Sequence, residues 1–165
     1  MNFEDKITTM KKQIRISISG QNTIVADFLV NRLLPNDQII KVGPFVFLDH
    51  LYPKLHKGQT PEAYSGQNAH PHRGIATFSY VLSGELQHFD SRNHQGIVEE
   101  GGAQWMKAGS GIVHDERPGP RFQREGGILH SLQFWINLPA SVKSEAPDYA
   151  ILSPRDIGSG PKSVD

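Results

Sequence analysis

Turn-forming residues recur at short intervals along this chain and leave only brief apolar runs between them. Its 165 residues include 16 glycines and 11 prolines. The turn signals before Pro139 include Ser83-Gly84, Asn93 to Gly96, Gly101-Gly102 and Gly109-Ser110-Gly111. Short runs bounded in this way are typical of strands rather than long helices. The sequence therefore predicts an all-β fold, a small antiparallel barrel or sandwich with little helix.

The individual strands are predicted from alternation or from short unbroken apolar runs. They cover residues 13–19, 45–48, 77–82, 85–89, 112–116 and 129–137. Residues 83–84 are predicted to form a tight hairpin turn. Residues 23–34 fit either a short helix or a strand, and residues 52–69 are predicted to form a polar loop.

The length of the chain suits one domain with its own hydrophobic core. We expect residues 1–152 to form this domain, with residues 1–12 as a polar leader. Residues 153–165 contain Gly, Pro and Ser with few apolar residues, so they are predicted to be a tail or linker.

Charge and cysteine content exclude several kinds of function. Seventeen basic residues balance seventeen acidic ones, so nothing favours direct nucleic-acid binding. The absence of cysteine excludes disulfides, thiolate metal sites and a cysteine nucleophile. The chain has no apolar run of membrane-spanning length and no signal-like start. These features predict a cytoplasmic protein without a membrane partner.

Two short segments each place a pair of metal-capable side chains two residues apart on an expected strand. They are His70 and His72 in HPH, and His114 and Glu116 in HDE. Because alternate residues of a strand share a face, the members of each pair point the same way. Pro71 favours the extended backbone that this arrangement needs. Neighbouring strands would bring three imidazoles and one carboxylate together.

This ligand set suits Fe, Mn, Ni, Cu or Zn, and the residue types do not choose among these metals. A site with fewer than six protein ligands leaves positions for water, oxygen or a substrate. A lone H-x-H pair is more often an ordinary surface or hydrogen-bonded pair. The second pair, on a later strand, shifts the interpretation to a metal site.

The segments HPHRGIATFSYVLSGELQHFDS, QWMKAGSGIVHDE and LQFWINLP occur in this order and resemble the pirin family of the cupin superfamily. The preceding VGPFVFLDH is also similar, so the resemblance runs from about Val42 to Pro139. It implies a single cupin barrel, jelly-roll-like, that holds one divalent metal ion, usually Fe(II). By position, the family's metal ligands correspond to His70, His72, His114 and Glu116.

The sequence departs from the family pattern in two residues and in length. Gly109 stands where a proline is usual in cupins, and Ala76 replaces a glutamate of many pirins. We expect Ala76 to alter the surroundings of the site rather than abolish binding. Pirins typically have two barrels, so the tail lies where a second cupin domain would begin. The chain is then a natural one-barrel member or a truncated form, and self-association through the uncovered surface is expected.

The resemblance implies an oxygenase of the quercetin 2,3-dioxygenase type, with a flavonol-like aromatic substrate. Glu116 would then be the catalytic base as well as a ligand. One alternative is a regulatory module, similar to a transcription cofactor, whose protein contacts depend on the metal or its redox state. Another is a truncated pirin that retains the metal without activity.

Other residues admit ordinary structural interpretations. His88 fits a neighbour of the site and a plain strand residue equally well, whereas four histidines are interpreted as loop or hydrogen-bonded residues: His50, His56, His94 and His130. Arg73 and Asp115 are expected to point away from the site, where Arg73 would pair with Asp115 or Glu85. Six residues would line a pocket or form core: Phe78, Tyr80, Trp105, Met106, Phe134 and Trp135.

Overall fold

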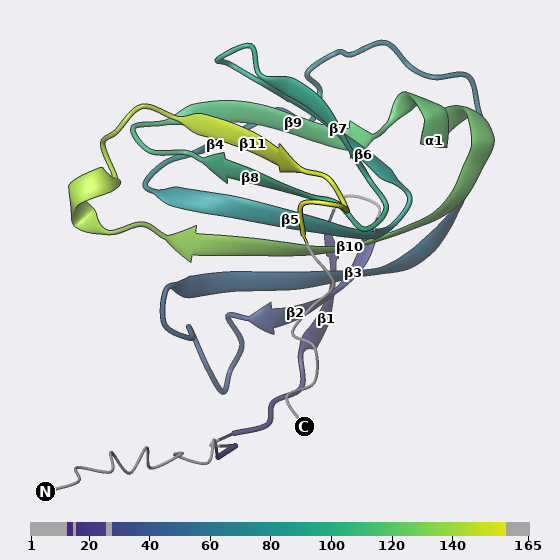
Figure 1. Cartoon of the computed structure of the whole chain (residues 1–165). Helices are drawn as coiled ribbons and strands as arrows, with labels where there is room; N and C mark the ends of the chain where they lie inside the picture. Colours follow the sequence, from purple (N-terminus) through teal and green to yellow (C-terminus); the bar gives the residue numbers. More distant parts are fainter. Residues whose placement is uncertain (1–12, 15, 26–27, 158–165) are drawn as a thin grey trace, which may run out of the picture.

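Two antiparallel sheets lie against each other in the computed structural model, which describes residues 13–14, 16–25 and 28–157 (Figure 1). The larger sheet has the strand order β1-β2-β3-β10-β5-β8-β11 and the smaller one β4-β9-β6-β7. The elements are β1 Gln21–Val25, β2 Phe28–Leu34, β3 Phe45–Lys57, β4 His70–His72, β5 Ile75–Ser83, β6 Glu85–Asp90, β7 Gln95–Glu99, β8 Ala103–Lys107, β9 Ile112–Pro118, α1 Pro120–Glu125, β10 Gly126–Asn137, the 3-10 turn Ala140–Val142 and β11 Asp148–Leu152. The predicted all-β fold with little helix is confirmed.

The strand predicted at residues 13–19 is wrong for the residues that the structure describes there, and Arg15 lies outside them. Ile14 and Ile16 are 90% and 55% exposed, and the first strand among the described residues begins at Gln21. Alternation favours a strand only where another strand and a buried face receive it. Within the range 23–34, the described residues form strands rather than a helix, because β1 and β2 pair with each other in antiparallel register.

The predicted loop at residues 52–69 is partly wrong, because β3 continues to Lys57. Pro53 made this segment a poor strand candidate, since proline cannot donate a ladder hydrogen bond. The structure accommodates it at an irregularity, where the register with β10 shifts between Leu129 and Ser131. A bulge therefore takes up the proline while β3 stays paired on both sides of it.

Ser83-Gly84 is a turn, but the predicted hairpin is wrong. β5 pairs with β10 and β8 in the larger sheet, whereas β6 pairs with β7 and β9 in the smaller one. Gly84 has a φ of 92°, and a Cβ there would lie 2.9 Å from the Ile128 carbonyl oxygen. The turn thus carries the chain across the edge from one sheet to the other.

Several short elements have no counterpart in the sequence prediction, namely β7, β8, α1, the 3-10 turn and β11. The short helix α1 begins with Pro120, which suits the first turn of a helix. Strand β11 pairs with β8 at the edge of the larger sheet. Tyr149 of β11 packs against the apolar cluster of Met106, Ala108 and Ile112. These elements are too short for a clear periodicity, so tertiary packing decides them.

Much of the surface enclosed between the sheets is polar. In β5 the buried positions include Thr77, Ser79 and Val81, which alternate with half-buried Phe78 and Tyr80. Other buried polar side chains include His88, Gln104, His114 and Ser131. Buried polar groups are costly unless they are paired or functional. The interior is therefore suited to a site rather than to a sealed apolar core.

Candidate metal centre

Strands β4 and β9 bring the two histidine segments together. They pair antiparallel, with His70 opposite His114 and His72 opposite Ile112. Pro71 keeps β4 extended, and Gly111 immediately precedes β9 with a φ of 133°. The predicted neighbouring strands are therefore present in the structure.

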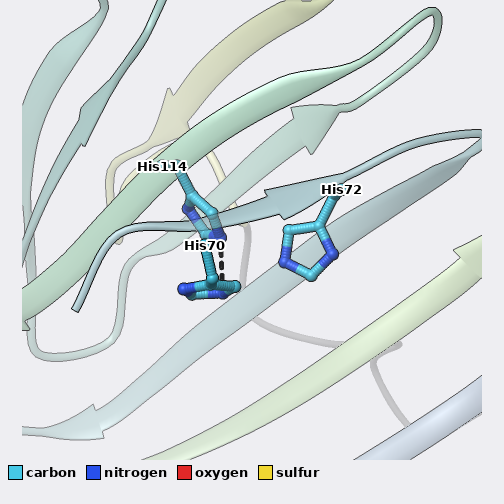
Figure 2. A group of neighbouring side chains, drawn as sticks. All are labelled: His70, His72 and His114. Atoms are coloured by element: carbon cyan, nitrogen blue, oxygen red, sulfur yellow. Dashed lines mark hydrogen bonds between the residues drawn. The ribbon is translucent and has the colours of Figure 1, made fainter.

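The side chains of His70, His72 and His114 form one cluster, as Figure 2 shows. The His70 and His114 Nε2 atoms lie 3.1 Å apart. The His72 ring centroid lies 4.9 Å from each of the other two. A ligand atom can be chosen from each residue so that all three lie within 4.8 Å of one another.

Exposure differs along the cluster. His70 is exposed, His72 is half-buried and His114 is 2% exposed. One side of the cluster therefore faces solvent, and the other is embedded between the sheets. This gradient leaves an open approach on the side of His70.

Hydrogen bonding orients the His70 ring. Its Nδ1 lies 2.9 Å from the Asn68 carbonyl oxygen, which can only accept a hydrogen bond. Nδ1 therefore carries the proton in the neutral ring, and the lone pair of Nε2 points toward His114. Fixing the second ring nitrogen in this way is typical of metal-bound histidines.

The two inner imidazoles are held neutral. Burial, together with the charge of His70, lowers the pKa of His72 to about 4. Burial lowers the pKa of His114 to about 2, with additional contributions from His70, His72 and His88. A metal ion needs the neutral form of the ring, so both side chains are ready to bind at neutral pH.

Glu116 lies two residues after His114 on the same face of β9, but it groups differently from the prediction. Its carboxylate clusters with His88 and His114, not with His70 and His72. Its Oε1 accepts hydrogen bonds from Ser79 Oγ at 3.3 Å and from Gln104 Nε2. The structure thus joins three of the four predicted ligands and places the fourth on the inner side of His114.

The electrostatic surroundings of Glu116 favour its neutral form. Burial raises the pKa of this carboxyl to about 7, against the lowering effects of His70 and of the hydrogen bonds from Ser79 and Gln104. Such a group exchanges its proton near neutral pH, which suits an acid or base.

The donor set fits a divalent transition metal. Two imidazole nitrogens bound to one ion at about 2.0–2.1 Å lie roughly 3 Å apart when the bonds meet near a right angle. The 3.1 Å between the His70 and His114 nitrogens matches this spacing. Three neutral imidazoles with a nearby carboxylate suit iron, zinc, manganese, nickel or copper.

The neighbours of the cluster include residues that the sequence did not single out. Ser79, Gln104 and Tyr149 hold the inner side through hydrogen bonds, and the Tyr149 hydroxyl donates to Gln104 Oε1 at 2.9 Å. The sequence signal that could have identified them is a polar residue at a buried position of an otherwise apolar strand, as with Ser79 in β5 and Gln104 in β8. His88 is a neighbour of the site, because its Nδ1 lies 3.4 Å from Nδ1 of His114.

Arg73 and Asp115 lie outside both histidine groups, but neither predicted partner of Arg73 is found. Glu85 pairs with Arg121 at 3.0 Å, and no ion pair of Arg73 occurs among the described residues. Asp115 is 3% exposed, and its Oδ1 has no hydrogen-bond partner within the described part of the chain. The long side chain of Arg73 is exposed instead.

The remaining histidines lie away from the cluster. His50 and His130 contact each other through their Nε2 atoms at 2.7 Å. His94 Nδ1 lies 2.8 Å from Asp90. His56 is on β3, not in a loop, and packs against the rings of Phe28 and Phe122.

The six pocket or core candidates divide between the two faces of the larger sheet. Trp135 borders the metal cluster, with its ring 5.2 Å from that of His72 and stacked on Phe47. Met106 belongs to the core cluster. The other four lie on the alternate positions of their strands: Phe78, Tyr80, Trp105 and Phe134.

Comparison with known proteins agrees with this architecture. A model of the Pirin family matches residues 27–136. A pirin-like protein of Caulobacter vibrioides is 37% identical over 133 residues, covering 80% of this chain and 45% of the relative. The Arabidopsis thaliana pirin-like protein At1g50590 is 40% identical over 131 residues, covering 78% of this chain and 39% of that protein.

The same likeness is found in three dimensions. A quercetin 2,3-dioxygenase of Acinetobacter baumannii superposes with a TM-score of 0.74 and 32% identity, over 84% of this chain and 48% of that one. Two packed antiparallel sheets with a histidine cluster define a protein of the cupin type. The chain belongs to the pirin family, and it spans about half the length of the curated relatives it matches. No helix within the described ranges has the length and apolar character to cross a membrane.

Proposed function

We propose that this protein holds one divalent metal ion, iron(II), through His70, His72, His114 and Glu116. The observation that carries the proposal is the convergence of three imidazoles, two of them with Nε2 atoms 3.1 Å apart. Glu116 is the proposed fourth ligand, because it lies two residues after His114 on the same face of β9. The same donor types suit zinc, manganese, nickel and copper, so those ions are the alternatives to test.

The proposed activity is oxygenation of a flavonol-like substrate, by analogy with the quercetin 2,3-dioxygenase of similar structure. The bound ion would supply Lewis-acid and redox chemistry to a substrate oxygen and to dioxygen. The open side at His70 admits the substrate, and the half-buried Trp135 beside His72 offers an aromatic surface for its flat ring.

Glu116 is the proposed catalytic base. Its pKa, raised to about 7 by burial, allows the carboxylate to accept the proton of a substrate hydroxyl near neutral pH. Ser79 and Gln104 both donate to its Oε1 and hold the side chain in place. Neither neighbour carries a charge that would fix the carboxyl in one protonation state.

The experiment is oxygen uptake by iron-loaded protein with quercetin, compared among the unsubstituted protein, His70→Ala and Glu116→Ala. We expect both variants to lose at least about 100-fold in rate, since each lacks a direct ligand or the base. His130→Ala is the matched control, because that histidine lies outside the metal cluster and contacts His50. Equal rates in all four proteins would contradict an oxygenase role.

A second proposal is a metal-dependent module for protein contacts. The outward face of the larger sheet carries apolar side chains, among which Phe45 and Leu82 are 38% and 37% exposed. The same exposed apolar side chains could also support self-association of two copies of this chain. Sedimentation of metal-free and metal-loaded protein tests both ideas, and an unchanged monomer at high concentration in both states would count against them.

A further inference from the structure

A line of buried side chains extends from the histidine cluster to Asp90 at the end of β6, on the same face of the smaller sheet. His114 Nδ1 lies 3.4 Å from His88 Nδ1, and His88 Nε2 lies 3.1 Å from Asp90 Oδ2. His88 and the Asp90 side chain are 1% and 0% exposed. The ring of Tyr149 stacks on His88 at 4.1 Å, which holds the imidazole in plane. The His88 imidazole thus links the Asp90 carboxylate to the His114 ring through one contact on each side.

The hydrogen-bonding capacity of each group decides where the protons lie. An ionised carboxylate only accepts hydrogen bonds, so His88 must donate through Nε2–H to Asp90. A neutral imidazole carries one proton, and in His88 the contact of Nε2 with Asp90 Oδ2 places that proton on Nε2. His88 Nδ1 is therefore bare, and it can only accept from the Nδ1–H of His114. His114 is left with a bare Nε2.

The lone pair of His114 Nε2 then faces His70 Nε2, which the hydrogen bond to Asn68 also leaves bare. Two lone pairs at 3.1 Å repel each other unless a cation lies between them. We propose that Asp90 and His88 are positioning residues that set the tautomer of His114, so that its Nε2 lone pair is presented to the metal ion. This inference rests on the proposed metal site and assigns a role to two residues outside the ligand set.

The backbone fixes the direction of the Asp90 carboxylate. Its Oδ1 accepts hydrogen bonds from the backbone N–H groups of Arg92 at 2.8 Å and His94 at 3.1 Å. Its Oδ2 is left for the His88 and His94 rings. The turn between β6 and β7 therefore holds one oxygen and aims the other at His88.

This geometry makes Asp90→Asn a sharp test. The two backbone N–H groups require an acceptor, so the amide oxygen takes the Oδ1 place and the amide nitrogen faces His88. The amide would donate to His88 Nε2 and reverse the tautomers of His88 and His114. A hydrogen atom would then occupy the position of the metal-binding lone pair. An analogous Asp-to-Asn change beside a catalytic histidine is known to impose the wrong tautomer.

Two measurements test the proposal. Nitrogen-15 NMR of metal-free protein labelled in histidine should show His88 as the Nε2–H form and His114 as the Nδ1–H form, and Asp90→Asn should reverse both. Zinc affinity, measured by competition with a chromophoric chelator, should fall about 10- to 100-fold in Asp90→Asn. His94→Ala is the matched control, because it removes another partner of Oδ2 and keeps the carboxylate that accepts from His88 Nε2; its zinc affinity should stay within about threefold.

A double substitution separates positioning from a general loss of structure. If Asp90 acts through His88, Asp90→Asn should change zinc affinity less than about threefold in a His88→Phe background. An undiminished loss there would overturn the proposal, as would a His114 found as the Nε2–H form in the unsubstituted protein. The NMR result does not require metal binding, so failure of zinc to bind the unsubstituted protein would contradict the proposed function separately.

Discussion

His70 and His114 face each other across the β4–β9 ladder with their Nε2 atoms 3.1 Å apart. Strand pairing sets this approach, because directly opposite residues of an antiparallel pair have side chains on the same face. His72 completes the cluster from the other end of β4. The three imidazoles therefore meet on one face of the β4–β9 ladder.

Glu116→Gln is expected to separate stability from binding. The raised pKa of about 7 means that folding disfavours the charged carboxylate. Above pH 7, a neutral amide of the same size should therefore make the metal-free protein more stable, while zinc affinity falls about tenfold because a charged ligand is lost. Urea unfolding at pH 8 and chelator competition measure the two effects. A less stable variant with unchanged affinity would show that Glu116 is a structural residue only.

The metal-free protein should lose stability as the pH falls from about 6.5 toward 4. Unfolded His72 and His114 take up protons near their ordinary pKa of 6.5, whereas folding lowers these pKa values to about 4 and about 2. The unfolded state therefore binds more protons in this window, and lower pH favours it. Glu116 acts in the opposite direction, because the folded state keeps its proton up to about pH 7. The stability lost through the two histidines should exceed the stability gained through the one carboxyl.

Urea midpoints at pH 7 and pH 5, with chelator present, measure this dependence. His72→Gln should reduce the difference between the two midpoints, since it removes one of the responsible groups. A higher midpoint at pH 5 than at pH 7 in the unsubstituted protein would contradict the expected sign.

Binding of a paramagnetic ion should quench tryptophan fluorescence through Trp135. Its ring lies 5.2 Å from that of His72, whereas Trp105 is on a strand position that faces away from the site. Titration with cobalt(II) should quench the unsubstituted protein, and Trp135→Phe should remove most of the response. Trp105→Phe is the matched control. Equal quenching in both variants would place the bound ion elsewhere.

Gly84→Ala should destabilise the fold by about 1–3 kcal/mol. Gly84 has a φ of 92°, and an added Cβ would lie 2.9 Å from the Ile128 carbonyl oxygen. Both features oppose a side chain where the chain passes between the sheets. Urea unfolding checks the value. Ser83→Ala is the control at the neighbouring position, and equal stability of the two variants would contradict the assigned role of the turn.

The histidine pairs could be predicted because strand alternation is a local rule. His70 and His72 share a face whatever lies beside them, and so do His114 and Glu116. The partner of each side chain depends on sheet order, which single-strand patterns do not contain. The placement of Glu116 beside Ser79 and Gln104 therefore needed the structure.

The same limit explains the errors in the fold. Gly84 signals a turn, but the residue type does not say whether the chain returns in the same sheet or crosses to the other one. Pro53 signals a break, yet the irregularity opposite it on β10 absorbs the proline and lets β3 continue. Local chemistry marks such positions, and tertiary pairing decides what happens there.

X-ray absorption of the zinc-loaded protein tests the central claim most directly. We expect three imidazole ligands and one carboxylate oxygen around one zinc, with zinc–nitrogen distances of about 2.0–2.1 Å. His114→Ala should reduce the imidazole count or abolish stoichiometric binding. A zinc ion in the unsubstituted protein with one imidazole or none, surrounded by oxygen, would contradict the proposed centre.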